Sequence, residues 1–196
     1  MISVILAHPR PGSFNHAIAA TVVQVLEAQG HEVRFHDLYR ENFNPVLEAA
    51  ELERHAPLPP FLEEHCREIA QAQGIVIVHP NWWGQPPAIL KGWVDRVFRP
   101  EVAYRFREGD GGEGVPVGLL PVKAAMVFTT SNTPRERELA VFGDPLETLW
   151  KNCLFGLCGA PYFVRRNFEV VVTSTPAQRQ AWLEEVRQLL CIFTPA

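Results

Sequence analysis

The chain has 196 residues, of which 47% are hydrophobic and 20% charged, and its formal net charge is -4. This length and composition predict one globular domain over residues 1–196 and exclude disordered and fibrous classes. The slight acidic balance provides no broad basic surface for phosphate backbones, so we expect no nucleic-acid partner.

The first predicted elements are a strand and a helix. Ile2 to Ala7 is an unbroken apolar run, typical of a strand buried on both faces. From Phe14 to Leu26, apolar residues recur at three- and four-residue spacing, which predicts a helix. Ser13 is a natural N-cap for that helix, and Gly30 a natural residue just beyond its end.

The turn between them, within LAHPRPGSFNHAI (residues 6–18), is the first candidate site. Backbone N–H groups at the start of a helix favour an anion, and His8 and Ser13 could add donors. The alternative is an ordinary strand-to-helix turn with a capping serine. Neither a GxGxxG fingerprint nor a Walker lysine motif is present.

The next segments predict a second strand, a connection, a helix and a central strand. Glu32 to Leu38 alternates and suits an edge strand, and residues 39–60 form an irregular connection or lid. Pro60 to Gln73 is helical in pattern. Ile75 to Val78 is an apolar β-branched run, which predicts a strand inside a parallel sheet.

The second strand-end turn, HPNWWGQPP (residues 79–87), carries adjacent tryptophans. Trp82 and Trp83 cannot both face one core from successive positions, whereas loop aromatics can stack on planar ligands. Asn81, Gly84 and backbone N–H groups could bond a heterocycle's edge. One tryptophan could instead be core, and a helix over Ala88 to Phe98 follows.

A third turn follows the next central strand. Residues 105–118 contain Gly109, Gly111, Gly112 and Gly114 among charges and predict a mobile surface loop. Val122 to Phe128 predicts a strand, and it ends in TTSNTP (residues 129–134), which supplies hydroxyls, an amide and turn N–H groups. A polar turn that caps a helix is the alternative, and residues 135–138 suit a solvated helix face.

The last elements complete an alternating pattern. Asp144 to Leu157 predicts a helix, Tyr162 to Val172 a strand region, and Pro176 to Leu190 an amphipathic helix. Alternating strands and helices predict a doubly wound α/β sheet. Its ligands bind beyond the carboxyl ends of the strands, so the three turns should meet at one edge.

Other features predict no metal site and no membrane insertion. Cys66, Cys153, Cys158 and Cys191 lack metal-ligand spacing and suit free buried thiols. His16, His31, His36, His55 and His65 also lack such spacing and suit the surface. No basic leader or apolar run of a membrane-span length is evident, so we expect a cytoplasmic protein.

Several of these segments together resemble the NAD(P)H:quinone oxidoreductase family. The resemblance spans nearly the whole chain, and the block Pro87 to Phe98 (PAILKGWVDRVF) is its most specific part. The other matching positions are His8, Ser13, Phe14, Asn15, Pro80, Asn81, Trp82, Trp83, Gly84, Ala103, Tyr104, Thr129 and Thr130. The family implies a flavodoxin-like three-layer sandwich with a five-stranded parallel sheet in the order 2-1-3-4-5.

The resemblance also implies a bound flavin and its location. The phosphate is expected at His8, Ser13, Phe14 and Asn15, and the isoalloxazine ring against Pro80, Asn81, Trp82, Trp83 and Gly84. Thr129, Thr130, Ser131 and Asn132 are expected near the ring's pyrimidine side. Family members are homodimers with sites at the interface, where Tyr104 and Phe106 match positions lining the partner's substrate pocket and the helix Pro87 to Phe98 serves the interface.

Two departures from the family bear on the pocket and the mechanism. Ser131 and Asn132 stand where the family often has two glycines, so the pocket should be narrower or differently shaped. The Tyr and His that stabilise charge in some members are missing, and Phe142 stands where that His would be. A charge relay through those side chains is therefore not expected.

The predicted function is hydride transfer from NAD(P)H through the flavin to a quinone or similar acceptor, in ping-pong order. The alternative is a flavin-bound regulatory partner of a transport system, with reductase activity secondary. In that case residues 39–59 and the glycine-rich loop would be contact surfaces. FMN is expected over FAD because the chain lacks the carboxyl-terminal extension of the longer FAD-binding members.

Overall fold

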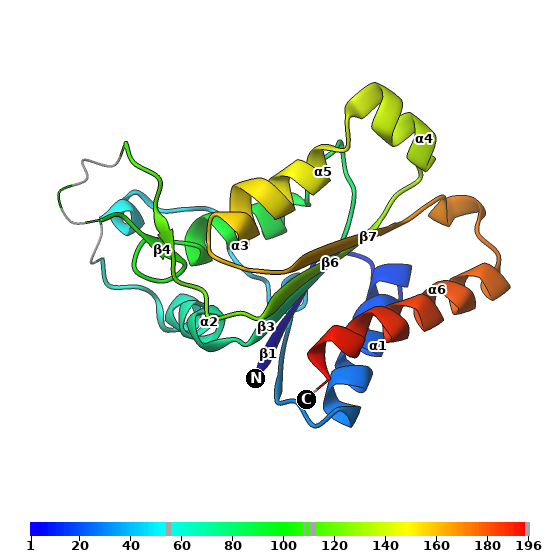
Figure 1. The fold of residues 1–196 in the computed structure, drawn as a ribbon, viewed down its shortest axis with the longest axis horizontal. Helices are drawn as coiled ribbons and strands as arrows, with labels where there is room; N and C mark the ends of the chain where they lie inside the picture. Colours follow the sequence, from blue (N-terminus) through cyan, green and yellow to red (C-terminus); the bar gives the residue numbers. More distant parts are fainter. Residues whose placement is uncertain (54–55, 108, 110–112, 195–196) are drawn as a thin grey trace.

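A computed structural model gives the fold, and it describes residues 1–53, 56–107, 109 and 113–194. The five central strands are β1 (Ile2–Leu6), β2 (Val33–Asp37), β3 (Gly74–Pro80), β6 (Ala124–Thr130) and β7 (Phe163–Phe168). They form one parallel sheet in the order β2-β1-β3-β6-β7 (Figure 1). Numbered among themselves, these strands have the predicted order 2-1-3-4-5, so the predicted flavodoxin-like fold is confirmed.

Helices cover both faces of the sheet, which makes three layers (Figure 1). One face packs against α1 (Phe14–Ala28) and α6 (Pro176–Leu189), and its core includes Val4, Val76 and Met126. The other face packs against α2 (Pro60–Gln71), α3 (Ala88–Val97) and the segment after α5 (Pro145–Glu147). Because successive residues of a strand point to opposite faces, the uniformly apolar strands supply both cores.

Local sequence sets where α1 begins and ends. The hydroxyl of Ser13 accepts a hydrogen bond from the backbone N–H of His16 (3.4 Å), as an N-cap does. Gly30 follows the last turn with φ +83°, the left-handed conformation that glycine adopts without strain. Both predicted boundaries are therefore confirmed. They place the N-terminus of α1 at the carboxyl edge of the sheet.

The connection from β2 to α2 is fastened to α3. The guanidinium of Arg96 donates to both carboxylate oxygens of Glu51 (3.0 and 2.5 Å) and to the carbonyl of Asn44 (2.6 Å), and the ion pair is buried. A Cβ on Gly92 would lie 2.2 Å from the carbonyl oxygen of Pro45, so this glycine permits the close approach. A short 3-10 helix, Ala49–Leu52, carries Glu51.

Several predicted boundaries differ from the structure. The predicted loop 105–118 is bracketed by a short antiparallel pair, β4 (Tyr104–Arg105) with β5 (Val117–Gly118). The predicted helix 144–157 is α5 followed by a π-helical stretch, Thr148–Gly156. The predicted strand 162–172 ends at Phe168 and continues as a 3-10 turn, Val171–Thr173.

Two further elements complete the described chain. The helix α4 (Arg135–Arg137) continues as a π-helical turn, Glu138–Phe142, and α6 continues as a 3-10 turn, Leu190–Phe193. Residues 135–137 are exposed, as predicted for a solvated face, but Glu138 is buried. Its carboxylate is drawn inward because it accepts a hydrogen bond from the amide of Asn81 (3.2 Å).

The predictions for cysteine and histidine are partly wrong. Cys66 and Cys158 are buried free thiols, but Cys153 and Cys191 are exposed. His65 is buried, and His16, His31 and His36 are half-buried because each contacts a polar partner; His55 lies outside the described residues. None of the described helices is both long and apolar enough to cross a bilayer.

Candidate functional site

The first wall of the site is the turn from β1 into α1. Gly12 has φ +70°, which lets the chain reverse before the helix begins at Phe14. The backbone N–H groups of Phe14 and Asn15 have no hydrogen-bond partner within the described residues. They lie at the positive end of the α1 dipole, where an anion is stabilised.

The side chain of Ser13 is connected to a histidine and an aspartate. Its hydroxyl lies 2.8 Å from Nδ1 of His16, and Nε2 of His16 lies 3.4 Å from the carboxylate of Asp37. Nearby, Nδ1 of His8 accepts a hydrogen bond from the backbone N–H of Arg10 (3.1 Å). Burial is the largest cause that lowers the pKa of His8, so its neutral form is favoured.

The second wall is the turn after β3, where a side-chain amide holds the backbone. Oδ1 of Asn81 accepts the N–H of Gly84 (2.9 Å), and its Nδ2 donates to Glu138. Trp83 and Gly84 both have positive φ, 57° and 71°. A Cβ on Gly84 would lie 2.7 Å from Cγ of Pro145, so glycine also allows this turn to pack on α5.

The third wall is the turn after β6, and it is tied to the first. Nδ2 of Asn15 donates to the hydroxyl of Thr130 (2.9 Å), which joins residues 115 positions apart. Oδ1 of Asn15 is buried and has no hydrogen-bond partner within the described residues. The backbone N–H groups of Asn132 and Thr133 likewise have no partner among them.

These three turns enclose a cavity of about 620 Å³. Its described lining contains two arginines and no carboxylate, and the arginines form no ion pair with a carboxylate of the described chain. The lining residues are His8, Arg10, Gly12, Ser13, Phe14, Asn15, Pro80, Asn81, Trp82, Thr130, Ser131, Asn132, Thr133, Val171, Val172 and Arg179. The free N–H donors and the cationic rim suit an anionic ligand of moderate size.

Most of the site residues predicted from the sequence therefore line one cavity. Trp83, Gly84 and Thr129 do not line it. Trp83 is fully exposed, and Thr129 is buried one residue back along β6. Tyr104 and Phe106 pack edge-to-face (ring centroids 5.9 Å apart) and do not line it either.

The sequence analysis missed Arg179 and Arg10. Arg179 lies on α6, and its guanidinium donates to the hydroxyl of Ser174 (2.7 Å) and the carbonyl of Val171 (3.2 Å). A basic residue on an amphipathic surface helix has no local signal that separates it from ordinary surface charge. Arg10 lies inside the turn already singled out, and its positive charge beside a predicted anion site was a usable signal.

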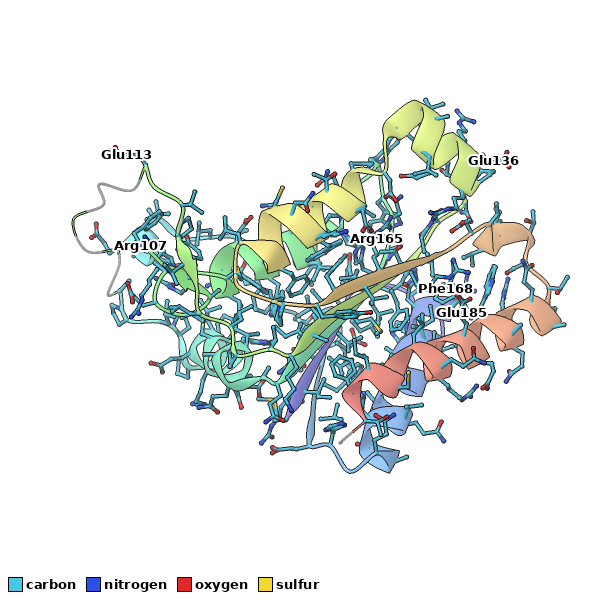
Figure 2. The ribbon with its side chains drawn as sticks, in the orientation of Figure 1. Arg107, Glu113, Glu136, Arg165, Phe168 and Glu185 are labelled. Carbon is cyan, nitrogen blue, oxygen red and sulfur yellow. The ribbon has the colours of Figure 1, made fainter. Side chains whose placement is uncertain are left out.

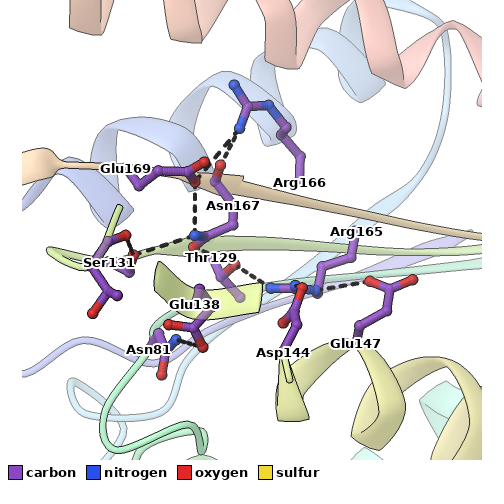
Figure 3. A network of polar contacts seen from close by, with 11 residues as sticks. Asn81, Thr129, Ser131, Glu138, Asp144, Glu147, Arg165, Arg166, Asn167 and Glu169 are labelled. Carbon is purple, nitrogen blue, oxygen red and sulfur yellow. Dashed lines mark hydrogen bonds and ion pairs between the residues drawn. The ribbon is translucent and has the colours of Figure 1, made fainter. Parts of the chain in front are cut away.

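A buried polar network supports the third turn from behind (Figure 3). Arg165 bonds to the carboxylate of Asp144, donates to Glu147 (3.0 Å), and donates to the hydroxyl of Thr129 (3.1 Å). Figure 2 shows Arg165 in the interior, between β7 and α5, whereas Glu136 lies at the exposed tip of α4. The arginine thereby joins α5, β6 and β7.

The network continues from Thr129 to the turn itself. Because Arg165 donates to the hydroxyl of Thr129, that hydroxyl donates to Oδ1 of Asn167 (2.9 Å). Nδ2 of Asn167 then faces Ser131 (3.3 Å) and Glu169 (2.8 Å). This chain of hydrogen bonds fixes the orientation of the Asn167 amide and holds the side chain of Ser131. The resembled family often has a glycine at the position of Ser131.

A second buried support lies under the tryptophan turn. Nδ1 of His79 contacts the carbonyl of Pro80 (2.8 Å) and therefore donates, while Nε2 accepts from the indole N–H of Trp150 (3.0 Å). Burial, with a smaller contribution from the charge of Arg165, lowers the pKa of His79 to about 4. The histidine is therefore neutral near pH 7, with both nitrogens satisfied.

Comparisons with known proteins agree with this fold. A family model described as a flavodoxin-like fold matches residues 1–190. An uncharacterized NAD(P)H oxidoreductase of Haemophilus influenzae is 38% identical over 161 residues, 80% of this chain and 77% of that protein.

Two solved structures extend the comparison. The NAD(P)H:quinone oxidoreductase of Methanothermobacter marburgensis has a TM-score of 0.78 at 25% identity, covering 95% of this chain and 93% of that one. An FMN-dependent NADH-azoreductase of Bacillus anthracis in complex with FMN has a TM-score of 0.74 over 99% of both chains. At 13% identity, the azoreductase shows the shared fold alone.

Proposed function

The chain belongs to the flavodoxin-like family of NAD(P)H:quinone oxidoreductases, and we propose on that premise that it binds FMN and reduces quinone-like acceptors with NAD(P)H. The observation that carries the proposal is the cavity where three strand-end turns meet, with free N–H donors and no carboxylate in its described lining. The order is ping-pong: NAD(P)H binds, delivers hydride and leaves before the acceptor binds.

The residues present fit a phosphorylated flavin. The N–H groups of Phe14 and Asn15, with the hydroxyl of Ser13, would hold the phosphate at the start of α1. Oδ1 of Asn15, which has no partner among the described residues, would accept a hydrogen bond from a hydroxyl of the ribityl chain. A buried acceptor without a donor destabilises the folded protein, and a bound ligand that supplies a donor removes this penalty. Trp82 would provide an aromatic wall for the ring.

The chemistry that FMN supplies when bound is the acceptance and donation of hydride. The protein binds, orients and stabilises charge. The N–H groups of Asn132 and Thr133 would face the pyrimidine edge, where negative charge develops on reduction, and N–H donors fixed in advance stabilise such charge. No side-chain acid or base is required, which agrees with Phe142 at the position where some members of the family have a histidine.

We propose FMN over FAD because one helix N-terminus supplies the phosphate donors, and the fold is shared with an enzyme named as FMN-dependent. Quinone is the proposed acceptor class because the neighbour at 25% identity is named as a quinone oxidoreductase.

The decisive experiment is an anaerobic titration of the full chain reconstituted with FMN. Addition of NADPH or NADH should bleach the visible flavin absorption, and a quinone should restore it. In a separate sample the chain is offered equal amounts of FMN and FAD, and identification of the flavin that stays bound separates the two. A chain that binds no flavin at micromolar concentration would overturn the proposal, as would bound flavin that NAD(P)H does not reduce.

Ser13→Ala tests the location of the phosphate. The variant should weaken FMN binding about 10-fold, since one hydrogen bond to a charged group is lost, and should leave riboflavin binding unchanged. An equal effect on both ligands would place the phosphate elsewhere.

Slow turnover together with capture of a membrane transport system would favour the regulatory alternative.

A further inference from the structure

A second cavity, of about 370 Å³, lies where β2, the following connection and α2 meet. His36 on β2, Glu41 in the connection and His65 on α2 contribute side chains to it. We propose that these three residues form a binding site for a divalent cation of the zinc class. The site is separate from the flavin cavity and is independent of the proposed reductase function.

The three side chains are already close enough to share one ion. Each offers one ligand atom, and the three atoms lie within 4.8 Å of one another. Nδ1 of His36 lies 3.0 Å from one oxygen of Glu41, and Nε2 of His65 lies 3.8 Å from the other. Ligands of a tetrahedral zinc are about 3.3 to 3.5 Å apart, so a small adjustment would close the site.

A fourth residue orients one ligand. Nε2 of His36 lies 2.5 Å from the carboxylate of Glu68 on α2. When the Nε2–H group of His36 donates a hydrogen bond to Glu68, the lone pair on Nδ1 is left to bind a metal ion on the side of Glu41. Histidines that bind metals usually donate their other nitrogen to a carboxylate or carbonyl in this way, which fixes the ring and raises its basicity.

The composition of the site selects the class of ion. Two imidazoles and one carboxylate suit zinc or a neighbouring transition metal, whereas magnesium and calcium prefer all-oxygen sets. Although burial lowers it, hydrogen bonds to Glu41 and Glu68 raise the pKa of His36 to about 9, so a divalent cation would take the place of the ring proton between His36 and Glu41. Three protein ligands leave one position for water on the side of the cavity.

One contact opposes binding and thereby limits the affinity. The indole N–H of Trp93 donates to Nδ1 of His65 (3.3 Å), so in the metal-free protein the ring proton of His65 is on Nε2. Ligation through Nε2 requires that proton to move to Nδ1, and the Trp93 hydrogen bond is given up. We therefore expect micromolar rather than nanomolar affinity, and Trp93→Phe should bind the metal more tightly.

The test is a titration of the full chain with Zn²⁺ and, separately, with Co²⁺, followed by calorimetry and visible absorption. The expected result is one ion per chain, with a cobalt spectrum that lacks the thiolate charge-transfer band. His36→Gln, Glu41→Gln and His65→Gln should each lower the affinity at least 10-fold. His31→Gln, which removes an imidazole elsewhere on the chain, should not.

Two results would overturn the inference. One is a zinc affinity that is unchanged in all three ligand variants when circular dichroism shows that they are folded. The other is a thiolate band, which would assign the ion to the exposed Cys153 or Cys191. FMN uptake is measured in the same samples, and the ligand variants should retain it, so failure of the metal site and failure of the flavin site are distinguishable.

Discussion

The side-chain amide of Asn15 joins two of the three turns that enclose the proposed flavin cavity. Its Nδ2 donates to the hydroxyl of Thr130, and its buried Oδ1 has no hydrogen-bond partner among the described residues. A buried acceptor of this kind is destabilising in the free protein and is satisfied when a ligand supplies a donor. We therefore expect Asn15 to lower the stability of the free protein slightly and to raise its affinity for the ligand.

Asn15→Ala should weaken FMN binding by roughly 10-fold or more, because it removes this acceptor and releases Thr130. The dissociation constant is measured by quenching of flavin fluorescence. Thr21→Ala is the matched control on the same helix, since its hydroxyl bonds to the carbonyl of Ala17 within α1. Equal losses in the two variants would show that α1 as a whole was perturbed.

His79 makes stability dependent on pH. Its folded pKa of about 4 lies below the ordinary 6.5, so the unfolded chain binds more protons between these values. The stabilisation from neutral His79 is fully present above pH 6.5 and is lost as the pH falls toward 4, by up to about 1.4 kcal/mol per pH unit.

The measurement is urea unfolding between pH 7 and pH 4, and His79→Gln should flatten the dependence. Glutamine retains a donor for Pro80 and an acceptor for Trp150 but does not titrate. A variant that keeps the wild-type slope would assign the dependence to other groups.

At the scale of elements, the Arg96–Glu51 pair holds the connection of β2 and α2 against α3. Both charges are buried, and the carboxylate accepts two hydrogen bonds from the guanidinium. Removal of one partner leaves the other charge unpaired in the interior, which is far more costly than the loss of an exposed pair.

Glu51→Gln should lower the free energy of unfolding by about 3 kcal/mol. Lys91→Ala, which removes the exposed Lys91–Asp95 pair of α3, should lower it by less than about 1 kcal/mol. Urea denaturation of both variants at pH 7 tests the contrast. Similar small losses would mean that the connection contributes little to the folded state.

Helices and strands were predicted correctly where the sequence pattern that defines them is local. The apolar runs at Ile2 and Ile75 predicted central strands, and Ser13 and Gly30 predicted both ends of α1. The π-helical stretch after α5 and the short β4–β5 pair were missed, because neither changes the apolar spacing enough to be recognised.

The predicted meeting of the three turns is confirmed for a different reason. Parallel strands bring their carboxyl ends to one edge, so turns that are distant in sequence could be assigned to one site. Arg179 and the cluster of His36, Glu41 and His65 were missed because their proximity depends on how helices pack on the sheet. The full exposure of Trp83 could not be predicted either, since it follows from a left-handed backbone at that residue.

At the scale of the whole molecule, the assembly implied by the family is a homodimer, which we keep as a prediction. Trp83 is fully exposed, and Val141 and Phe142 expose apolar surface beyond α4. A second copy that covers this surface would explain why it is apolar.

Light scattering coupled to size-exclusion chromatography should then give twice the 22.1 kDa of one chain. Phe142→Asp should shift the protein toward monomer, because a charge would be buried at the contact. Arg187→Ala, which removes a charge on α6, should not. A mass of one chain at micromolar concentration would contradict the prediction.

The sheet's hydrogen bonds extend beyond its strands to the turns that line the proposed flavin cavity. The N–H of Ala7 donates to Val78, that of Asn81 to Thr130, and that of Ser131 to Phe168. The first residue of each turn is therefore hydrogen-bonded to the neighbouring strand in the same way as the residues of the sheet. In deuterated buffer these three amide hydrogens should be replaced as slowly as those of β3, whereas those of Asn132 and Thr133 should be replaced quickly until FMN binds. NMR detection of the exchange would show whether the cavity is assembled before its ligand arrives.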